Sequence, residues 1–406
     1  AGRRFGGGRR RGRLDRNGGR RLFGRLIVGN PSIEEPSYLS RLSVAFWSTL
    51  LPTVALAVFL AAVAVAVWAG VLLIAFFANR GDDVGKLGQF VGNLGGGPLA
   101  GAGIVDSLVG LLIAGAIAAA WFGIGNLIVS RLVSFESAGE RSYLLNVVLS
   151  FALGAAIWSF VWFLLGLAGL YSRPVAVVAL VLGVLPAIVG LLKFKNAAKA
   201  NRESQPSEVF DKFVLLLAAV PVLLSLIAAL APPTAKDTLL YHFSVPKAFI
   251  AQGSSAFIEG NIASYLALGT EMHVVWAMLL GGPFGERAGE AASGAAVWLF
   301  FPLLLAALFG FAREAGISRR WSLIAVLMVA TVPTAYHVAA SAYIDLALAL
   351  YVLLAAVALT RWWRSLESRW LILMAIFLGA ALASKLTTLF VIAAFALVVV
   401  MRARSE

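Results

Sequence analysis

"FVLLLAAVPVLLSLIAALAPPTAKDTLLYHF", residues 213–243, joins two segments of very different chemistry. Residues 213–231 form an uncharged apolar run of about twenty residues, which is the length at which an α-helix spans the hydrocarbon of a bilayer. Pro232 and Pro233 then end the helix, because the second proline has no N–H to donate and the pair favours extended backbone. The polar residues that follow therefore lie outside the apolar layer.

The same alternation of long apolar runs and short polar loops fills the chain. Of its 406 residues, 61% are hydrophobic and 13% are charged, which is typical of a protein whose solvent is lipid. Unbroken runs of this length favour helices over the short alternating strands of an outer-membrane barrel. We predict an all-α, polytopic bundle of about ten transmembrane helices. The candidate spans are 53–78, 104–130, 143–171, 174–193, 213–231, 288–312, 320–340, 343–361, 370–385 and 386–401.

Composition divides the chain into three parts. Residues 1–43 are predicted to be a disordered basic tail, because ten arginines and many glycines fill the first 25 positions. Residues 44–212 hold four spans of unassigned role, and residues 213–406 form the predicted functional core. The chain begins with Ala1 and its last apolar run ends close to Glu406, so it is compatible with a truncated protein.

The net charge of +13 first suggests a nucleic-acid partner. Most of the excess lies in the tail, however, where it suits a cytoplasmic surface beside anionic lipid. We therefore expect membrane lipid and no nucleic acid as a partner. The absence of cysteine excludes disulfides and thiolate metal sites.

Basic loops give the orientation, because cytoplasmic loops carry an excess of Lys and Arg. All basic loops fall on the side of the N-terminus only if residues 265–280 do not cross the membrane. That stretch is short and contains Glu271 and His273, which would be costly at the bilayer centre. We predict a multi-pass protein of the cell inner (plasma) membrane with a cytoplasmic N-terminus.

Residues 265–280 are instead predicted to form an amphipathic helix in the outer interface, with Trp276 and Met278 on its apolar side. Everything from about 232 to 287 then forms one long extracytoplasmic loop that contains juxtamembrane helices.

Three charged residues are expected at this outer face. Asp237 follows the proline pair, Asp345 opens the span after a turn at 341–343, and Lys385 lies in the turn between the last two spans. Simpler readings stay open: either aspartate could cap a helix, and the lysine could snorkel to the interface.

The outer loop supplies further polar residues. The segment "DTLLYHFSVPKAFIAQG" is predicted to be a short helix that ends at Gly253, and it brings Tyr241, His242 and Lys247 near Asp237. A divalent cation held by Asp237, His242 and Glu271 is left as an open alternative. Motifs of soluble enzymes, such as phosphate-binding glycine loops, HExxH and GxSxG, are absent.

Four stretches in this order resemble the GT-C superfamily of membrane glycosyltransferases. They are "DTLLYHFSVPKAFIAQG", "NIASYLALGTEMHVVWAMLLGGPFGER", "VPTAYHVAASAYIDLALALYVLL" and "LGAALASKLTTLF". The nearer relatives are similar to protein mannosyltransferases and lipid A aminoarabinose transferases. The resemblance covers about residues 213–401, and the first four spans have no counterpart.

The resemblance implies a sugar donor on a polyprenyl phosphate, and a lipid, glycan or protein acceptor. It implies Asp237 as the catalytic carboxylate, Asp345 as the second acidic position, and Lys385 as the residue near the donor phosphate. Many relatives carry Asp-Glu in the first loop, whereas Thr238 follows Asp237 here. This departure weakens the transfer of any role of the second acid, including metal binding.

Elementary chemistry agrees with this expectation. A lipid-phosphate donor presents its sugar at the headgroup plane, and a positioned carboxylate can take the proton of an acceptor hydroxyl. Lys385 could offset charge on the departing phosphate. We expect Tyr241, His242, Lys247 and Glu271 to contact substrate, and inversion at the sugar carbon. The alternatives are a transporter or flippase, or a non-catalytic subunit of a membrane assembly.

Overall fold

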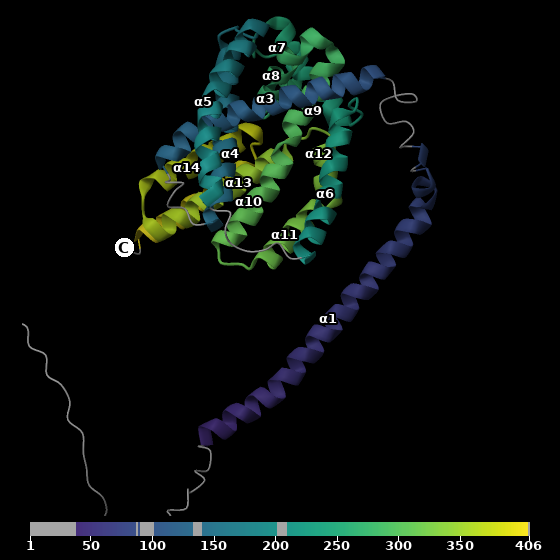
Figure 1. Ribbon diagram of the computed structural model, residues 1–406, viewed down its shortest axis with the longest axis vertical. Coiled ribbons are helices and arrows are strands. Elements are labelled where there is room, and N and C mark those ends of the chain that lie inside the picture. The colour runs from purple at the N-terminus through teal and green to yellow at the C-terminus, as the bar shows by residue number, and fades with distance from the viewer. Residues whose placement is uncertain (1–37, 87, 90–100, 133–139, 201–208, 405–406) are drawn as a thin grey trace, which may run out of the picture. The chain divides into compact units, whose positions relative to one another are not determined.

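The computed structural model describes residues 38–86, 88–89, 101–132, 140–200 and 209–404 (Figure 1). These residues are helical almost throughout, and no strand occurs among them. The predicted all-α, polytopic class is confirmed. The chain separates into two compact units, Ala1–Leu87 and Gly88–Glu406. The disorder predicted for the basic tail concerns positions 1–37, which lie outside the described residues.

The described part of the first unit is one long helix, α1, Tyr38–Gly85. It includes positions 38–43, which composition assigned to the tail, and it continues through Pro52. Within Phe59–Gly85, the most apolar stretch of 18 residues has a mean hydropathy of 2.7, so the helix presents a continuous apolar surface there. Such a surface is expected of a helix whose apolar side chains face lipid.

The second unit is a helix bundle (Figure 1). Its long helices are α3 (Gly101–Leu132), α4 (Glu140–Leu167), α5 (Arg173–Ala200), α6 (Val209–Leu230), α9 (Glu286–Trp298), α10 (Phe300–Glu314), α11 (Arg319–Ala330), α12 (Pro333–Ala340), α13 (Asp345–Ser365), α14 (Ser368–Ser384) and α15 (Thr388–Arg404).

Each of the ten predicted spans has a helical counterpart. The span 288–312 corresponds to α9 with α10, and the span 320–340 to α11 with α12, which meet at a bend of 62°. Within the described residues, seven helices are long and apolar enough to cross a membrane, or eight if that bent pair is one span. α14 and α15 have 17 residues each and are shorter.

Glycines bring α3 and α4 into backbone contact. A Cβ atom on Gly154 would lie 1.7 Å from the carbonyl oxygen of Trp121, and one on Gly125 would lie 1.7 Å from that of Ser150. No larger residue fits at either position without separating the helices. Close approach at small residues is the usual way in which membrane helices gain packing energy, because lipid and side chains are equally apolar.

Between α6 and α9 the chain forms five short helical segments. They are η1 (Thr238–His242), α7 (Ser244–Gln252), η2 (Ile262–Tyr265), α8 (Glu271–Gly281) and η3 (Gly282–Phe284). α7 ends where predicted, at Gly253, whose φ of 72° is a left-handed conformation that glycine adopts without cost. We call the end of the bundle that carries these segments the loop end.

The prediction of an amphipathic helix exposed at the interface over residues 265–280 is wrong, because the helix found there is buried in the protein. α8 begins only at Glu271, and of its eleven residues all but Leu280 are buried. Trp276 is fully buried, its ring lies 4.8 Å from that of Trp158 and 5.7 Å from that of Trp162, and its N–H donates to the carbonyl of Ala176. The side chains of α8 therefore pack against other helices of the protein. Hydropathy alone does not distinguish such packing from contact with lipid, because both surroundings are apolar.

Candidate active site

Four segments meet at the loop end and are joined by hydrogen bonds. The hydroxyl of Thr238 donates to the carbonyl of Ser341, which links η1 to the turn before α13. The N–H of Gly269 donates to the carbonyl of Ala383 over 2.8 Å, which links the start of α8 to the end of α14. The side chains of Thr270 and Ser384 are also bonded, at 2.9 Å. These bonds hold Asp237, Glu271, Asp345 and Lys385 on neighbouring segments.

Lys385 and Asp345 form an ion pair. Lys385 Nζ lies 2.7 Å from Asp345 Oδ1, and both side chains are 45% exposed. Asp345 is the first residue of α13, where a carboxylate also interacts favourably with the helix dipole. The pair brings together two of the three charged residues expected at the outer face.

Tyr241 lies near three carboxylates. Burial first, and then the nearby charges of Asp237, Glu271 and Asp345, together raise the pKa of its phenol to about 12. These three residues, which we call the carboxylate cluster, are thus within electrostatic reach of one side chain. The phenol stays neutral and can donate a hydrogen bond at any physiological pH.

Asp237 does not cap a helix. Its backbone is already helical, with φ −71° and ψ −31°, and its side chain makes no capping hydrogen bond. No described residue pairs with its carboxylate through a hydrogen bond or salt bridge. The side chain is half-buried. The simplest structural reading, a cap after the proline pair, therefore loses its support.

His242 and Glu271 form a buried pair behind Tyr241. His242 Nδ1 lies 2.7 Å from Glu271 Oε1, and each side chain is 2% exposed. The imidazole also lies against the rings of Tyr241 and Tyr343, at centroid distances of 4.1 and 5.4 Å. The second carboxylate oxygen of Glu271 is buried without a partner. The pair fixes the position of α8 relative to η1.

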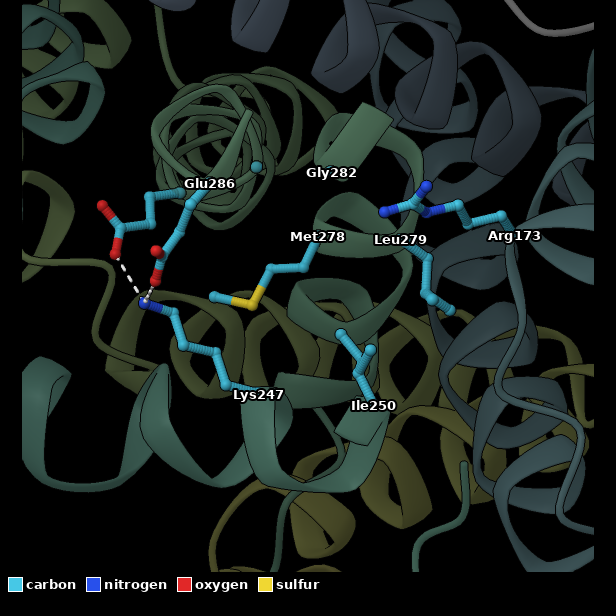
Figure 2. A pocket seen from close by; sticks show the side chains of 9 residues that line it. Arg173, Lys247, Ile250, Met278, Leu279, Gly282 and Glu286 are labelled. Atoms are coloured by element: carbon cyan, nitrogen blue, oxygen red, sulfur yellow. Dashed lines mark hydrogen bonds and ion pairs between the residues drawn. The ribbon is translucent and has the colours of Figure 1, made fainter. Parts of the chain in front are cut away.

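Lys247 does not join the carboxylate cluster but lines another pocket. Its ammonium lies 2.7 Å from Glu286 and 2.7 Å from Glu290, across from α7 to α9 (Figure 2). These bonds raise the pKa of the lysine against the opposing effect of burial. The predicted grouping of Lys247 with Tyr241 and His242 followed from sequence proximity, whereas the helix directs the side chain toward another pocket.

An apolar cavity of about 780 Å³ opens beside the turn that carries Lys385. Its lining includes the residues just before and after that turn, Ala383 and Leu386, and the aromatic side chains Phe160 and Phe163 of α4. Gly269, which is bonded to Ala383, also lines it. The charged pair thus lies next to a space suited to a hydrocarbon chain.

The described part of the chain holds no ligand set for a metal ion. Among the described residues, no three His, Asp or Glu side chains lie together in a way that could hold a metal. Two members of the expected set, His242 and Glu271, bond to each other instead. The divalent cation stays an alternative without a site in this part of the chain.

Residues 284–405 match the family model described as dolichyl-phosphate-mannose-protein mannosyltransferase. The match confirms the resemblance to the GT-C glycosyltransferases. It supports a membrane glycosyltransferase and a multi-pass membrane protein in general. No curated protein and no solved structure matches the chain. The GT-C-like region includes Asp345 and Lys385, whereas Asp237, Tyr241, His242, Lys247 and Glu271 precede the matched range.

Sequence reasoning did not single out Tyr343 or Arg173. Tyr343 follows Ala342, whose φ of 54° is unusual for a residue with a side chain, and its ring contacts both His242 and His337. A left-handed alanine leaves no clear signal in a single sequence. Arg173, at the start of α5, lines a pocket.

Proposed function

We propose that this protein transfers a sugar from a polyprenyl-phosphate donor to an acceptor hydroxyl on the extracytoplasmic side of the membrane. The observation that carries the proposal is the ion pair of Lys385 and Asp345, which lies beside an apolar cavity and shares Tyr241 as a neighbour with Asp237. The lysine of the pair can bind a phosphate, and the neighbouring cavity can bind a hydrocarbon chain.

The donor lies across the boundary between these features. The apolar cavity accommodates part of the polyprenyl chain, because its lining is mostly aliphatic and aromatic. The ammonium of Lys385 then meets the phosphate at the headgroup plane, and Asp345 holds that ammonium in position. As the bond between the sugar carbon and the phosphate oxygen breaks, the phosphate keeps the electron pair and the lysine offsets its charge.

Asp237 acts as the general base. Its carboxylate accepts no hydrogen bond from a described residue and carries no ion pair, so its oxygens are available to an acceptor. It takes the proton of the acceptor hydroxyl while the acceptor oxygen bonds to the sugar carbon, with inversion. General-base catalysis of this kind contributes about 10²- to 10⁴-fold.

Tyr241, His242 and Glu271 shape the acceptor side. The neutral phenol of Tyr241 donates a hydrogen bond to the sugar or the acceptor, and the buried pair of His242 and Glu271 keeps the phenol in place. The alternatives of a transporter and of a non-catalytic subunit have no comparable observation in their favour.

The proposal is tested in proteoliposomes that hold the purified full chain. A radiolabelled sugar on a polyprenyl phosphate is compared with the same sugar as a nucleotide donor. We expect transfer from the lipid donor alone, and only from vesicles whose loop end faces the added acceptor. Transfer from the nucleotide donor, or an equal rate in both orientations, would overturn the proposal.

A further inference from the structure

A second pocket opens at the loop end, apart from Lys385 and the carboxylate cluster. It has a volume of about 280 Å³ and lies among α5, α7, α8, η3 and α9 (Figure 2). Met278, Leu279 and Ile250 form an apolar wall, while charged side chains stand on two sides. The sugar-transfer reaction proposed above uses none of these residues.

On one side, the charges neutralise each other. Lys247 bonds to Glu286 and Glu290, each at 2.7 Å. Arg287 Nη1 lies 3.7 Å from the second oxygen of Glu290, so two cations and two carboxylates are paired in this group. Glu286 remains 77% exposed. This side therefore offers carboxylate oxygens as hydrogen-bond acceptors without a large net charge.

On the other side stands Arg173, an exposed residue at the start of α5. Among the described residues, no carboxylate or carbonyl pairs with its guanidinium, and the side chain points into the pocket (Figure 2). Gly282 is a close neighbour of the guanidinium, since a Cβ there would lie in ordinary contact with Arg173 Nη2, at 3.5 Å. A cation in the first turn of a helix is unfavourable for the helix dipole, so Arg173 does not serve the stability of α5.

We propose that this pocket binds an organic anion, a carboxylate or a phosphate ester, through Arg173. The guanidinium presents paired N–H groups that match the geometry of either anion. Hydroxyl groups of the same molecule donate to Glu286, and its carbon skeleton packs on Met278 and Leu279. The volume suits a group about the size of one sugar or one lipid headgroup, so the anion can come from a soluble compound or from a lipid.

Chemical modification of the arginine tests the proposal on the intact protein. The full chain is placed in nanodiscs of phosphatidylcholine and treated with phenylglyoxal, and the modification rate of Arg173 is followed by peptide mass spectrometry during a titration with inorganic phosphate. Arg364 serves as the control, because it is exposed and lines neither described pocket. A parallel sample uses nanodiscs that contain phosphatidylglycerol.

A bound anion must slow the modification of Arg173 relative to Arg364. We expect about threefold protection when phosphate reaches about twice its dissociation constant. Protection by dissolved phosphate identifies a site for a soluble anion, and protection only in phosphatidylglycerol identifies a lipid headgroup. If neither condition protects Arg173 more than Arg364, the proposal is wrong. The readout does not depend on transferase activity, so it is independent of the proposed function.

Discussion

Lys385 Nζ lies 2.7 Å from Asp345 Oδ1, although forty positions separate the two residues in the chain. The contact joins the turn after α14 to the first turn of α13. Both side chains are 45% exposed, so the pair contributes only about 0–1 kcal/mol to stability. The proposed function gives this weakly stabilising pair a role in binding the donor phosphate.

Replacement of Lys385 by Met should therefore impair transfer far more than stability. We expect a loss of about 10²-fold in turnover, because the departing phosphate loses its cation, with little change in the unfolding transition. Lys247→Met is the matched control, since that lysine pairs with Glu286 and Glu290 in the other pocket. Equal losses of turnover in both variants would argue against a role for Lys385 at the donor phosphate.

Removal of Glu271 should destabilise the fold. Glu271→Ala leaves the buried Nδ1 of His242 without its hydrogen-bond partner, which costs about 1–3 kcal/mol. Glu286→Ala removes another carboxylate of an ion pair, but an exposed one, so little change is expected. The check is chemical unfolding of both variants in detergent. A Glu271→Ala protein as stable as Glu286→Ala would mean that the buried pair does not hold η1 and α8 together.

Gly154 should not tolerate even one methyl group. In Gly154→Ala the new Cβ atom would meet the carbonyl oxygen of Trp121 at 1.7 Å, so α3 and α4 must separate. Overpacking of this kind costs about 1–3 kcal/mol. Gly115→Ala is the control in α3, because no atom lies within 4 Å of its Cβ position. Thermal unfolding of the pair decides: a melting temperature of Gly154→Ala equal to that of the control would contradict this helix contact.

The phenol of Tyr241 should ionise only in strong alkali. Its folded-state pKa of about 12 lies above the ordinary value of 10.0, so the neutral phenol favours the fold below pH 10. This contribution is lost as the pH rises through 12. Ultraviolet difference titration of the wild type against Tyr241→Phe should show one phenol that ionises near pH 12. Ionisation near pH 10 would contradict both the burial of the Tyr241 phenol and its proximity to the carboxylate cluster.

Hydropathy and loop chemistry predicted much of the fold. Pro232 and Pro233 lie just after α6, and Gly253 ends α7. The side of the membrane on which Asp345 and Lys385 lie stays a prediction, but their presence at one end of the bundle follows from counting helices. The number of helices can be read from hydropathy without knowing which side chains are in contact.

Side-chain direction and the burial of α8 could not be predicted. Lys247 lies ten positions from Asp237, yet the π-helical turn of η1 and the following α7 direct it to Glu286 and Glu290. The indole ring of Trp276 can pack equally well against protein or against lipid. The sequence therefore does not predict that it packs on Trp158. The pairing of His242 with Glu271 joins η1 to α8 and depends on the same packing.

The assignment of Asp237 as the base is tested most directly by the turnover of Asp237→Asn. The full chain is reconstituted with a polyprenyl-phosphate sugar and an acceptor, beside Glu259→Gln, which alters an exposed carboxylate in the same loop. With both variants folded, as judged by unfolding, we expect Asp237→Asn to lose at least about a hundredfold in turnover and Glu259→Gln to match the wild type. Full turnover by Asp237→Asn would contradict the assignment.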